Sequence, residues 1–276
     1  MAHLKPWFET FHGQRLFCLA HEPTPPSTTA VLYVPPFAEE ANRTRHLAAR
    51  QARAFAEHGV EARFVDPTGT GDSAGDFADA TWSHWCAELR EARSRLLAEG
   101  YTRVVVWGVR LGCALALDAG LFDAGGAGIF WQPLLSPKAQ LRQYLRLRVA
   151  SGMSLNGRVS VGDLEARLAS EGRLDIGGYG ISRTLADEMT AAQPEETPTL
   201  PGHLLWIEVG TGQEGKLASA SMRTIAQWRS RGARITDRRV DGDQFWAIQT
   251  LGFAPALIEE TTRWLTAADP TGTNGL

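Results

Sequence analysis

The sequence has few of the features that mark secreted, metal-binding or membrane-anchored proteins. Its three cysteines, Cys18, Cys86 and Cys113, are far apart and form no CxxC pair, which argues against a disulfide framework and a zinc site. No apolar segment approaches the roughly 18 residues of a membrane-spanning helix, and the first residues lack the apolar core of a signal peptide. We therefore expect a cytoplasmic protein that needs no metal or other cofactor.

Excess charge of one sign is also absent. The formal net charge is -3, whereas a nucleic-acid partner favours a basic patch. With 43% hydrophobic and 21% charged residues, the composition is that of an ordinary globular protein. We therefore expect neither nucleic acids nor membranes as partners. A chain of 276 residues suits one large domain.

Segments typical of strands alternate with segments typical of helices. This alternation predicts an α/β fold with a mostly parallel twisted sheet flanked by helices. The expected strands are 16–20, 30–34, 60–65, 103–107, 128–132, 204–209 and 233–240. The expected helices are 43–58, 81–99, 112–121, 217–232 and 255–267.

The most informative segment is 108–112, which reads Gly-Val-Arg-Leu-Gly between the apolar run 104–107 and the helix-like run 113–117. A strand, a sharp Gly-x-Nuc-x-Gly turn and a helix are typical of the nucleophile elbow of α/β-hydrolases. Here Arg110 occupies the nucleophile position. A guanidinium offers five donors and no acceptor, so it cannot attack a carbonyl. The sequence therefore predicts a hydrolase scaffold without its reactive atom.

The other members of a Ser-His-Asp triad are not found either. Of the seven histidines only His203 follows the elbow, and it lies at the start of a predicted strand, whereas active sites of open α/β sheets lie at the carboxyl ends. Residues 242–246, where the triad histidine is expected, read Gly-Asp-Gln-Phe-Trp. The triad acid is expected within 210–214, where Glu214 is the one carboxylate and has no histidine to orient. We therefore expect no hydrolysis by a Ser-His-Asp triad.

Two glutamates follow the predicted strand 30–34, in the segment 35–40, which reads Pro-Pro-Phe-Ala-Glu-Glu. An α/β-hydrolase carries its oxyanion loop here, so the amides of Phe37 and Ala38 are expected to face the elbow. A cation at a helix N-terminus opposes the helix dipole by about 0.3–1 kcal/mol, so Arg110 needs a carboxylate or a bound anion. Two interpretations stay open: Arg110 pairs internally with Glu39 or Glu40, or it holds a ligand's carboxylate or phosphate together with the helix amides.

The expected ligand-binding residues lie at the carboxyl ends of the strands. They are Phe37, Ala38, Glu39, Glu40, Arg110, Leu111, Gln132, Gln244 and Trp246. Asp72 and Asp243 are further candidate partners of Arg110. No catalytic residue is assigned, but in an active enzyme Glu40 or Asp243 would activate water while Arg110 steadies the developing anion.

Two other nucleophiles are expected to have structural roles. Ser73 lies in a second Gly-x-Ser-x-Gly match, 71–75, but no strand runs directly into its first glycine, so it belongs to a glycine-rich turn. The same stretch lacks the Lys-Ser/Thr ending of a phosphate-binding Walker motif. Cys113 has no partner histidine and is expected in the core.

The alternation of strands and helices breaks between 136 and 201. In this architecture an insertion after the sixth strand forms a lid over the carboxyl ends of the strands. We therefore predict a core of 1–135 and 202–268, a helical lid of 136–201 and a flexible tail of 269–276. In the first lid helix, 141–148, one face either packs as a cap or brings Arg142, Arg146 or Arg148 to an anionic ligand.

These segments together resemble a subgroup of the α/β-hydrolase superfamily, the exosortase A system-associated hydrolases of the second type. The resemblance rests on 35–40 with Asn42, on 72–77, on 107–112 with Arg110 at the elbow, on 131–133 and on 143–148. It extends from about residue 16 to residue 264. It implies a bacterial cytoplasmic protein encoded near genes for exopolysaccharide synthesis and for the sorting of PEP-CTERM surface proteins.

The residues and the resemblance together favour a protein without triad hydrolysis. We expect it to bind a small acidic ligand or a partner protein of the exosortase and exopolysaccharide locus, and a homodimer is compatible with the sequence. The alternative is an active hydrolase of an ester or related acyl substrate that uses residues outside a triad.

Overall fold

The structure, a computed structural model, describes residues 3–151, 160–211, 216–248 and 250–267. The strands of its main sheet are β1 His3–Phe11, β2 Gln14–Glu22, β3 Thr29–Val34, β4 Glu61–Val65, β5 Arg103–Val109, β6 Ala127–Trp131, β9 His203–Val209 and β10 Arg234–Val240. The helices around it are α1 Glu39–Glu57, α2 Trp82–Ala98, α3 Leu111–Asp118, α7 Ser219–Ser230 and α8 Pro255–Thr266, with the short 3-10 helix η1 Phe77–Asp79.

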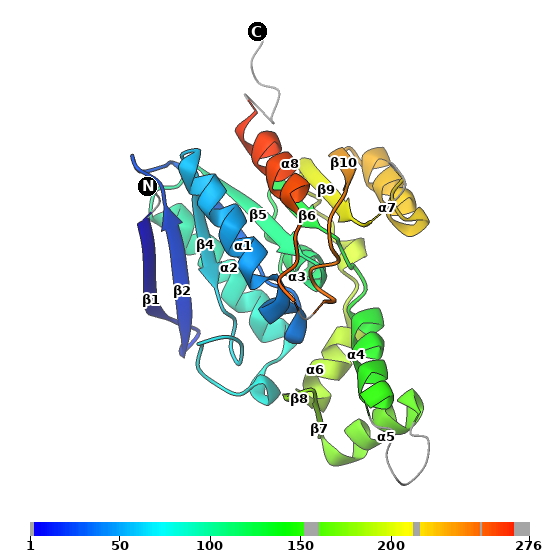
Figure 1. The fold of residues 1–276 in the computed structure, drawn as a ribbon. Coiled ribbons are helices and arrows are strands. Elements are labelled where there is room, and N and C mark those ends of the chain that lie inside the picture. The colour runs from blue at the N-terminus through cyan, green and yellow to red at the C-terminus, as the bar shows by residue number, and fades with distance from the viewer. Residues whose placement is uncertain (1–2, 152–159, 212–215, 249, 268–276) are drawn as a thin grey trace.

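The eight strands form one sheet in the order β1-β2-β4-β3-β5-β6-β9-β10 (Figure 1). β2 runs antiparallel to both of its neighbours, and the remaining pairs are parallel. The predicted α/β fold with a mostly parallel sheet is therefore confirmed. All seven expected strands and all five expected helices are present, with ends that differ by a few residues. Strand β1 was not predicted, because its first four residues are exposed and one of them is Pro6.

Helices cover both faces of the sheet. Along β5, Val105 and Trp107 pack with residues of α1 and α8 on one face, whereas Val104 and Val106 pack with α2, α3 and α7 on the other. Trp107 is fully buried, and its ring contacts that of Trp131 at a centroid distance of 4.7 Å. A strand that is buried on both faces reads as a continuous apolar run, which explains why β5 was recognised from its sequence.

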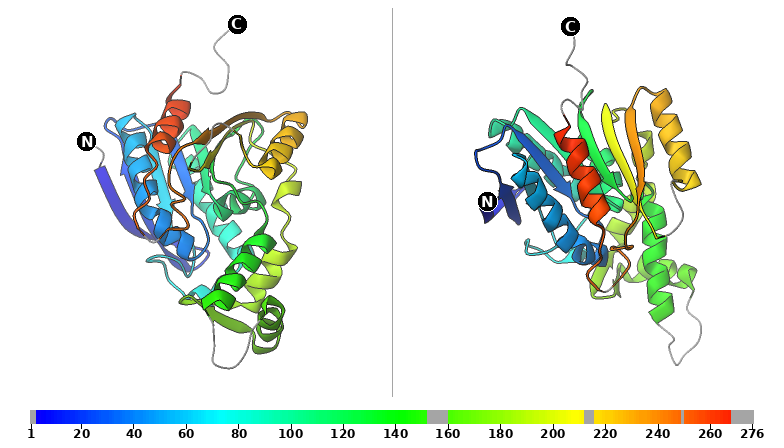
Figure 2. Two further views of the ribbon diagram at one scale, coloured as in Figure 1. Left: turned by 45° about the vertical axis from the view of Figure 1, so that its right-hand side comes forward. Right: turned by 45° about the horizontal axis from the view of Figure 1, so that its top comes forward.

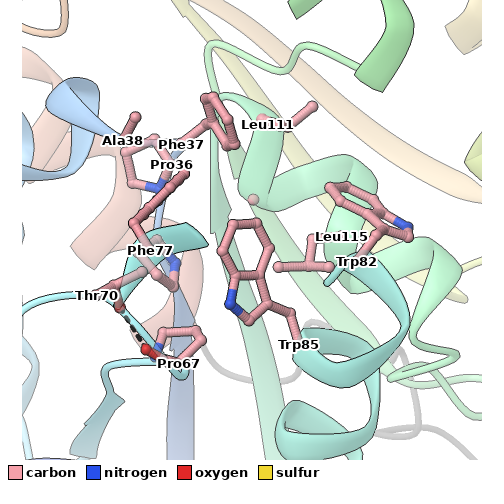
Figure 3. Close-up of a pocket in the computed structure, with 12 residues that line it drawn as sticks. Pro36, Phe37, Ala38, Pro67, Thr70, Phe77, Trp82, Trp85, Leu111 and Leu115 are labelled. Atoms are coloured by element: carbon pink, nitrogen blue, oxygen red, sulfur yellow. Dashed lines mark hydrogen bonds between the residues drawn. The ribbon is translucent and has the colours of Figure 1, made fainter. Parts of the chain in front are cut away.

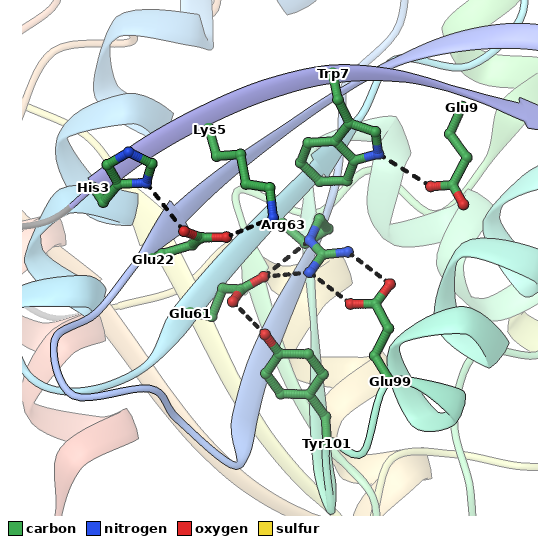
Figure 4. A network of polar contacts seen from close by, with 9 residues as sticks. All are labelled: His3, Lys5, Trp7, Glu9, Glu22, Glu61, Arg63, Glu99 and Tyr101. Carbon is green, nitrogen blue, oxygen red and sulfur yellow. Dashed lines mark hydrogen bonds and ion pairs between the residues drawn. The ribbon is translucent and has the colours of Figure 1, made fainter.

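A charged cluster fixes the antiparallel side of the sheet (Figure 4). The side chain of Arg63 on β4 is 10% exposed and donates hydrogen bonds to Glu61 and Glu99. Its guanidinium also lies 4.9 Å from the centre of the Trp7 ring on β1, and Tyr101 donates to the second oxygen of Glu61. A buried guanidinium is tolerated when its hydrogen bonds are made in this way. Glu61 begins β4, so the cluster lies at the amino ends of the parallel strands, away from the elbow.

The chain between β6 and β9 forms a separate insertion beyond one end of the sheet (Figures 1 and 2). It contains α4 Pro137–Ser151, α5 Val161–Glu171, α6 Arg183–Ala191, the 3-10 helix η2 Pro194–Glu196 and a hairpin of β7 Arg173–Ile176 and β8 Tyr179–Ser182. The hairpin was not predicted. Its turn, Gly177-Gly178, has two positive φ angles, 57° and 90°, and such a pair of glycines between strands is a hairpin signal.

Two of the three arginines predicted to reach an anionic ligand, Arg142 and Arg146, have exposed side chains on α4. Arg142 pairs with Glu165 at 3.4 Å on the exposed surface of the insertion. The side chain of Arg148 and the predicted tail 269–276 lie outside the described residues. Among the described residues, no helix is long and apolar enough to cross a membrane.

Candidate functional site

The turn between β5 and α3 has the backbone of a nucleophile elbow. Arg110 has φ 54° and ψ -122°, a conformation that costs a non-glycine residue about 1–3 kcal/mol. Both flanking glycines are required by close contacts. A Cβ on Gly108 would lie 2.8 Å from the Cα of Cys113, and one on Gly112 would lie 2.3 Å from the backbone oxygen of Val34. Arg110 therefore occupies a strained turn whose two glycines cannot be replaced without a clash.

Arg110 is held on both sides by backbone hydrogen bonds. Its amide donates to the carbonyl of Trp131 over 2.9 Å, and its carbonyl accepts from the amide of Leu134 over 3.2 Å. These bonds tie the elbow to the end of β6 and to the loop that follows it. The surrounding structure thus fixes the backbone that directs the Arg110 side chain.

The Arg110 side chain forms an ion pair with Glu40. Nε donates to one carboxylate oxygen and Nη2 to the other, each over 3.2 Å. The side chains are 9% and 14% exposed. Of the two interpretations left open by the sequence, the structure contains the internal pair. This pairing engages two of the five N–H donors of the guanidinium.

Two helix N-termini meet at this pair. Arg110 caps α3, where a cation is unfavourable, whereas Glu40 lies in the first turn of α1, where an anion is favourable. Ala38, the residue before α1, has φ 51° and ψ -128°, much like Arg110. The loop after β3 is therefore strained in the same way as the elbow. Glu40 compensates the charge that Arg110 places on α3.

The loop after β10 covers the pair. The Cζ atom of Arg110 lies 5.0 Å from the centre of the Trp246 ring, within the range of a cation–π contact. Asp243 shapes this loop, because its carboxylate accepts the amide of Phe253 over 2.8 Å and its own amide donates to the Phe253 carbonyl. Asp243 thus closes the loop instead of pairing with Arg110.

The two glutamines predicted to bind ligand have different environments. The side-chain oxygen of Gln132 accepts the amide of Val209 over 2.7 Å, and its backbone amide donates to Ile207 over 2.7 Å. Gln132 therefore joins β6 to β9. Gln244 is exposed, and its carbonyl accepts the amide of Ala247.

A small apolar cavity lies beside the elbow (Figure 3). Phe37, Trp85, Leu111 and Leu115 point into it, and its volume is about 20 Å³. That space is about the size of one water molecule. Three of the predicted residues, Phe37, Ala38 and Leu111, line this cavity.

A second, larger cavity of about 610 Å³ lies on the other side of Phe37. Its walls come from the start of α1, from α4, from the β7–β8 turn and from the loop after β10. Four of the predicted residues line it: Phe37, Glu39, Glu40 and Trp246. Its volume is in the range of small-molecule sites, about 300–1,000 Å³.

Sequence reasoning missed the contribution of the insertion to this cavity. Gln140 and Tyr144, one helical turn apart on α4, both line it. The predicted helix started at 141, one residue too late to include Gln140. The Tyr144 ring contacts the Phe37 ring at a centroid distance of 5.4 Å. Asn42, part of the resemblance, reaches the insertion by donating to the Tyr179 hydroxyl over 2.9 Å.

The other residues considered as nucleophiles or bases have positions that indicate structural roles. Ser73 accepts the amide of Phe17 and donates to the carbonyl of Asp66, so it fastens the turn to β2. Cys113 is fully buried, and burial raises its pKa well above the ordinary value. His203 begins β9, at the amino end of the strand. Glu214 lies outside the described residues.

No group of three or more His, Cys, Asp or Glu side chains among the described residues is arranged to hold a metal ion. The site contains an ion pair, aromatic rings, amides and a second glutamate.

No protein-family model and no curated protein matches this chain. Its likeness is to solved structures. Est1E from Butyrivibrio proteoclasticus, solved with bound ferulic acid, is 14% identical with a TM-score of 0.65 over 94% of this chain and 97% of that one. The α/β hydrolase GrgF from Penicillium sp. sh18 is 16% identical with a TM-score of 0.61 over 95% of this chain and 98% of that one.

XC6422 from Xanthomonas campestris, an α/β serine hydrolase without a lid, is 13% identical with a TM-score of 0.54 over 95% of this chain and 92% of that one. The TM-scores establish a common fold, whereas identities of 13–16% leave the activity open. Together with the strand order and the elbow, they show that the chain has the α/β-hydrolase fold.

Proposed function

We propose that this chain is a non-hydrolytic protein of the α/β-hydrolase fold that binds a small molecule in the 610 Å³ cavity next to the Arg110–Glu40 pair. One observation carries the proposal. The residue in the elbow conformation of a nucleophile is an arginine whose side chain is buried and already paired. The protein has thus converted the reactive centre of its fold into a fixed ion pair.

The surroundings of the elbow support the loss of hydrolysis. A triad needs a base beside its nucleophile, but residues 242–246 contain no histidine, and Asp243 is bonded to Phe253. An ester would therefore meet neither a serine nucleophile nor a histidine base at the elbow.

The alternative of an enzyme that uses residues outside a triad has less support. Glu40 is the partner of Arg110, and both of its carboxylate oxygens already accept hydrogen bonds from the guanidinium. Asp243 is engaged in its own loop. We therefore do not propose hydrolysis by Glu40 or Asp243, and the experiment below would detect it.

The biological setting that we propose rests on the sequence resemblance alone. It is the bacterial cytoplasm, with a role in the exosortase and exopolysaccharide system. A partner protein from that locus is a second candidate occupant of the surface around the cavity. The acidic ligand predicted from Arg110 stays a prediction, and it would share the guanidinium with Glu40, which accepts hydrogen bonds from Nε and Nη2.

The test is to treat the purified protein with a fluorophosphonate probe and with p-nitrophenyl esters, beside a serine esterase as a positive control. We expect no labelling and no hydrolysis above background. We also expect Arg110→Ser to gain little, because triad residues act as a unit and the base is missing.

Stoichiometric labelling of Ser73 or of any other serine would overturn the proposal. So would ester hydrolysis that Glu40→Gln or Asp243→Asn abolishes, and this result would favour the enzyme alternative.

A further inference from the structure

Two side chains of helix α1 hold the loop after β10. Arg43 donates from Nη1 to the carbonyl of Ala247 over 2.9 Å. Nε2 of His46 lies 2.8 Å from the carbonyl oxygen of Gly252. Both contacts end on the backbone of the loop, so they fix its path along α1. We call the described residues of this part of the loop, 246–248 and 250–253, the flap.

The flap forms one wall of the large cavity. Trp246 and Ala247 line the cavity, and the Trp246 ring also lies 5.0 Å from the Cζ atom of Arg110. In the other half of the flap, the side chains of Leu251 and Phe253 are 79% and 61% exposed. They contribute little apolar burial. That half of the flap therefore depends on its hydrogen bonds more than on side-chain packing.

The ring of His46 faces a carbonyl oxygen at each of its two nitrogens. Nε2 faces Gly252, and Nδ1 lies 3.2 Å from the carbonyl oxygen of Arg43. Both oxygens are acceptors, whereas a neutral imidazole has one N–H and one nitrogen with a lone pair. Only the protonated ring donates to both oxygens at once. Its hydrogen bonds are then charge-assisted and about twice as strong as neutral ones.

The charged neighbours of His46 keep their charge while a histidine titrates. On the elements around it they are Arg43 and Arg50 on α1, Asp241 and Asp243 in the loop and Glu259 and Glu260 on α8. Arginine stays protonated and ordinary carboxyl groups stay ionised over the range of about pH 5 to 8 in which histidine changes its charge. A change in the flap between pH 6 and pH 8 therefore indicates a histidine.

We propose that protonation of His46 latches the flap over the cavity and that loss of this proton loosens it. In the neutral ring, a proton on Nδ1 leaves the Gly252 carbonyl without a donor. A proton on Nε2 keeps this bond without its charge, and the Nδ1 lone pair then faces the Arg43 carbonyl. The inference rests on the proposed binding function and adds a regulation of the same site, in which the cavity is more closed at pH 6 than at pH 8.

The test measures amide hydrogen exchange by NMR on the full chain without ligand, at pH 6 and at pH 8. The reporters are the amides of Asp243 and Phe253, which bond to each other's residue across the neck of the flap. Each exchange rate is divided into the intrinsic rate at the same pH to give a protection factor, and amides of β5 report global stability. Relative to β5, the reporters should be protected about fivefold more at pH 6, because charged hydrogen bonds are stronger.

Three variants assign the effect. His46→Gln donates one uncharged hydrogen bond at every pH, so its reporter amides should be protected equally at both pH values. His58→Gln is the matched control, because His58 is an exposed histidine at the far end of the same helix, and it should keep the wild-type ratio. Arg43→Gln removes the tie whose charge does not titrate, so it should lower protection at both pH values and keep the ratio.

Each contrary outcome has a distinct meaning. Equal protection of the wild-type reporters at both pH values would overturn the latch, and this result needs no variant. A pH ratio that survives in His46→Gln, or one that disappears in Arg43→Gln, would overturn the role of His46. The measurement uses the free protein, so its failure is separate from that of the proposed function. Labelling by the fluorophosphonate would overturn the proposed function and leave the latch standing.

Discussion

The Arg110–Glu40 pair permits a quantitative test of the structure. Removal of the Glu40 charge by Glu40→Gln leaves the guanidinium of Arg110 buried and without its counterion, at the N-terminus of α3. Loss of one partner of a buried ion pair costs about 3–5 kcal/mol. The Glu40 side chain is 14% exposed, and the side-chain oxygen of the substituted glutamine can still accept one hydrogen bond from Arg110, so the cost should lie toward the lower end of this range. We therefore expect a loss of about 2–4 kcal/mol in the free energy of unfolding.

The partner variant should behave differently. Arg110→Met leaves Glu40 in the first turn of α1, where the helix dipole stabilises it, so its cost should be smaller. The double variant Arg110→Met/Glu40→Gln leaves no charge unpaired and should lie within about 1 kcal/mol of the wild type. The double-mutant cycle should then give a coupling energy of about 2–3 kcal/mol.

Urea unfolding followed by circular dichroism measures all four proteins. Glu39→Gln is the matched control, because Glu39 is the preceding residue but its side chain is 46% exposed and lies 3.6 Å from Arg43. An exposed pair of this kind contributes less than about 1 kcal/mol. If Glu40→Gln and Glu39→Gln cost the same, or if the cycle shows no coupling, the pair does not hold the elbow and the reasoning fails.

Three further predictions concern a glycine of the elbow, a buried glutamate and the serine of the 71–75 turn. Gly112→Ala should lower the free energy of unfolding in urea by at least about 1–3 kcal/mol, because the new methyl group would lie 2.3 Å from a backbone oxygen. Its control, Gly162→Ala in an exposed helical position, should raise that free energy by up to about 1 kcal/mol. Equal effects of the two substitutions would contradict this prediction. Burial raises the pKa of Glu88, so its contribution to stability is largest below the ordinary glutamate pKa and is lost as pH rises through the raised pKa. In Glu88→Gln, the free energy of unfolding in urea should not show this decrease between acidic and neutral pH. If the variant and the wild type show the same dependence on pH, the raised pKa of Glu88 is contradicted. Ser73→Ala should cost about 1–2 kcal/mol in the same assay through its lost hydrogen bonds. An unchanged free energy of unfolding would contradict the structural role of Ser73.

The main elements of the fold could be predicted because their signals are local. Runs such as 104–107 are apolar throughout, since helices cover both faces of the sheet. The elbow was recognisable because its glycines are demanded by contacts within a few residues and with the end of β3. Strand β1 and the β7–β8 hairpin were missed because exposed edges and four-residue strands leave little periodicity to read.

The site could be predicted only in part. The sequence named Glu40 and Glu39 as equal candidates for Arg110, because neighbouring residues on a loop cannot be ranked without the direction in which each points. It included Gln132 and Asp243 in the site, although their side chains bond to the backbone of Val209 and Phe253. Gln140 was overlooked because an amide on a helix carries no motif.

The sequence by itself determined the α/β architecture and the absence of a serine nucleophile at the elbow, since both depend on residue type and on short-range order. Only the tertiary structure decided that Arg110 pairs with Glu40 and that Gln140 shares a cavity with Trp246. Those contacts join segments 70 or more residues apart in the chain, and their geometry is set by how the insertion and the loops pack against the sheet. Sequence spacing carries no information on such distances.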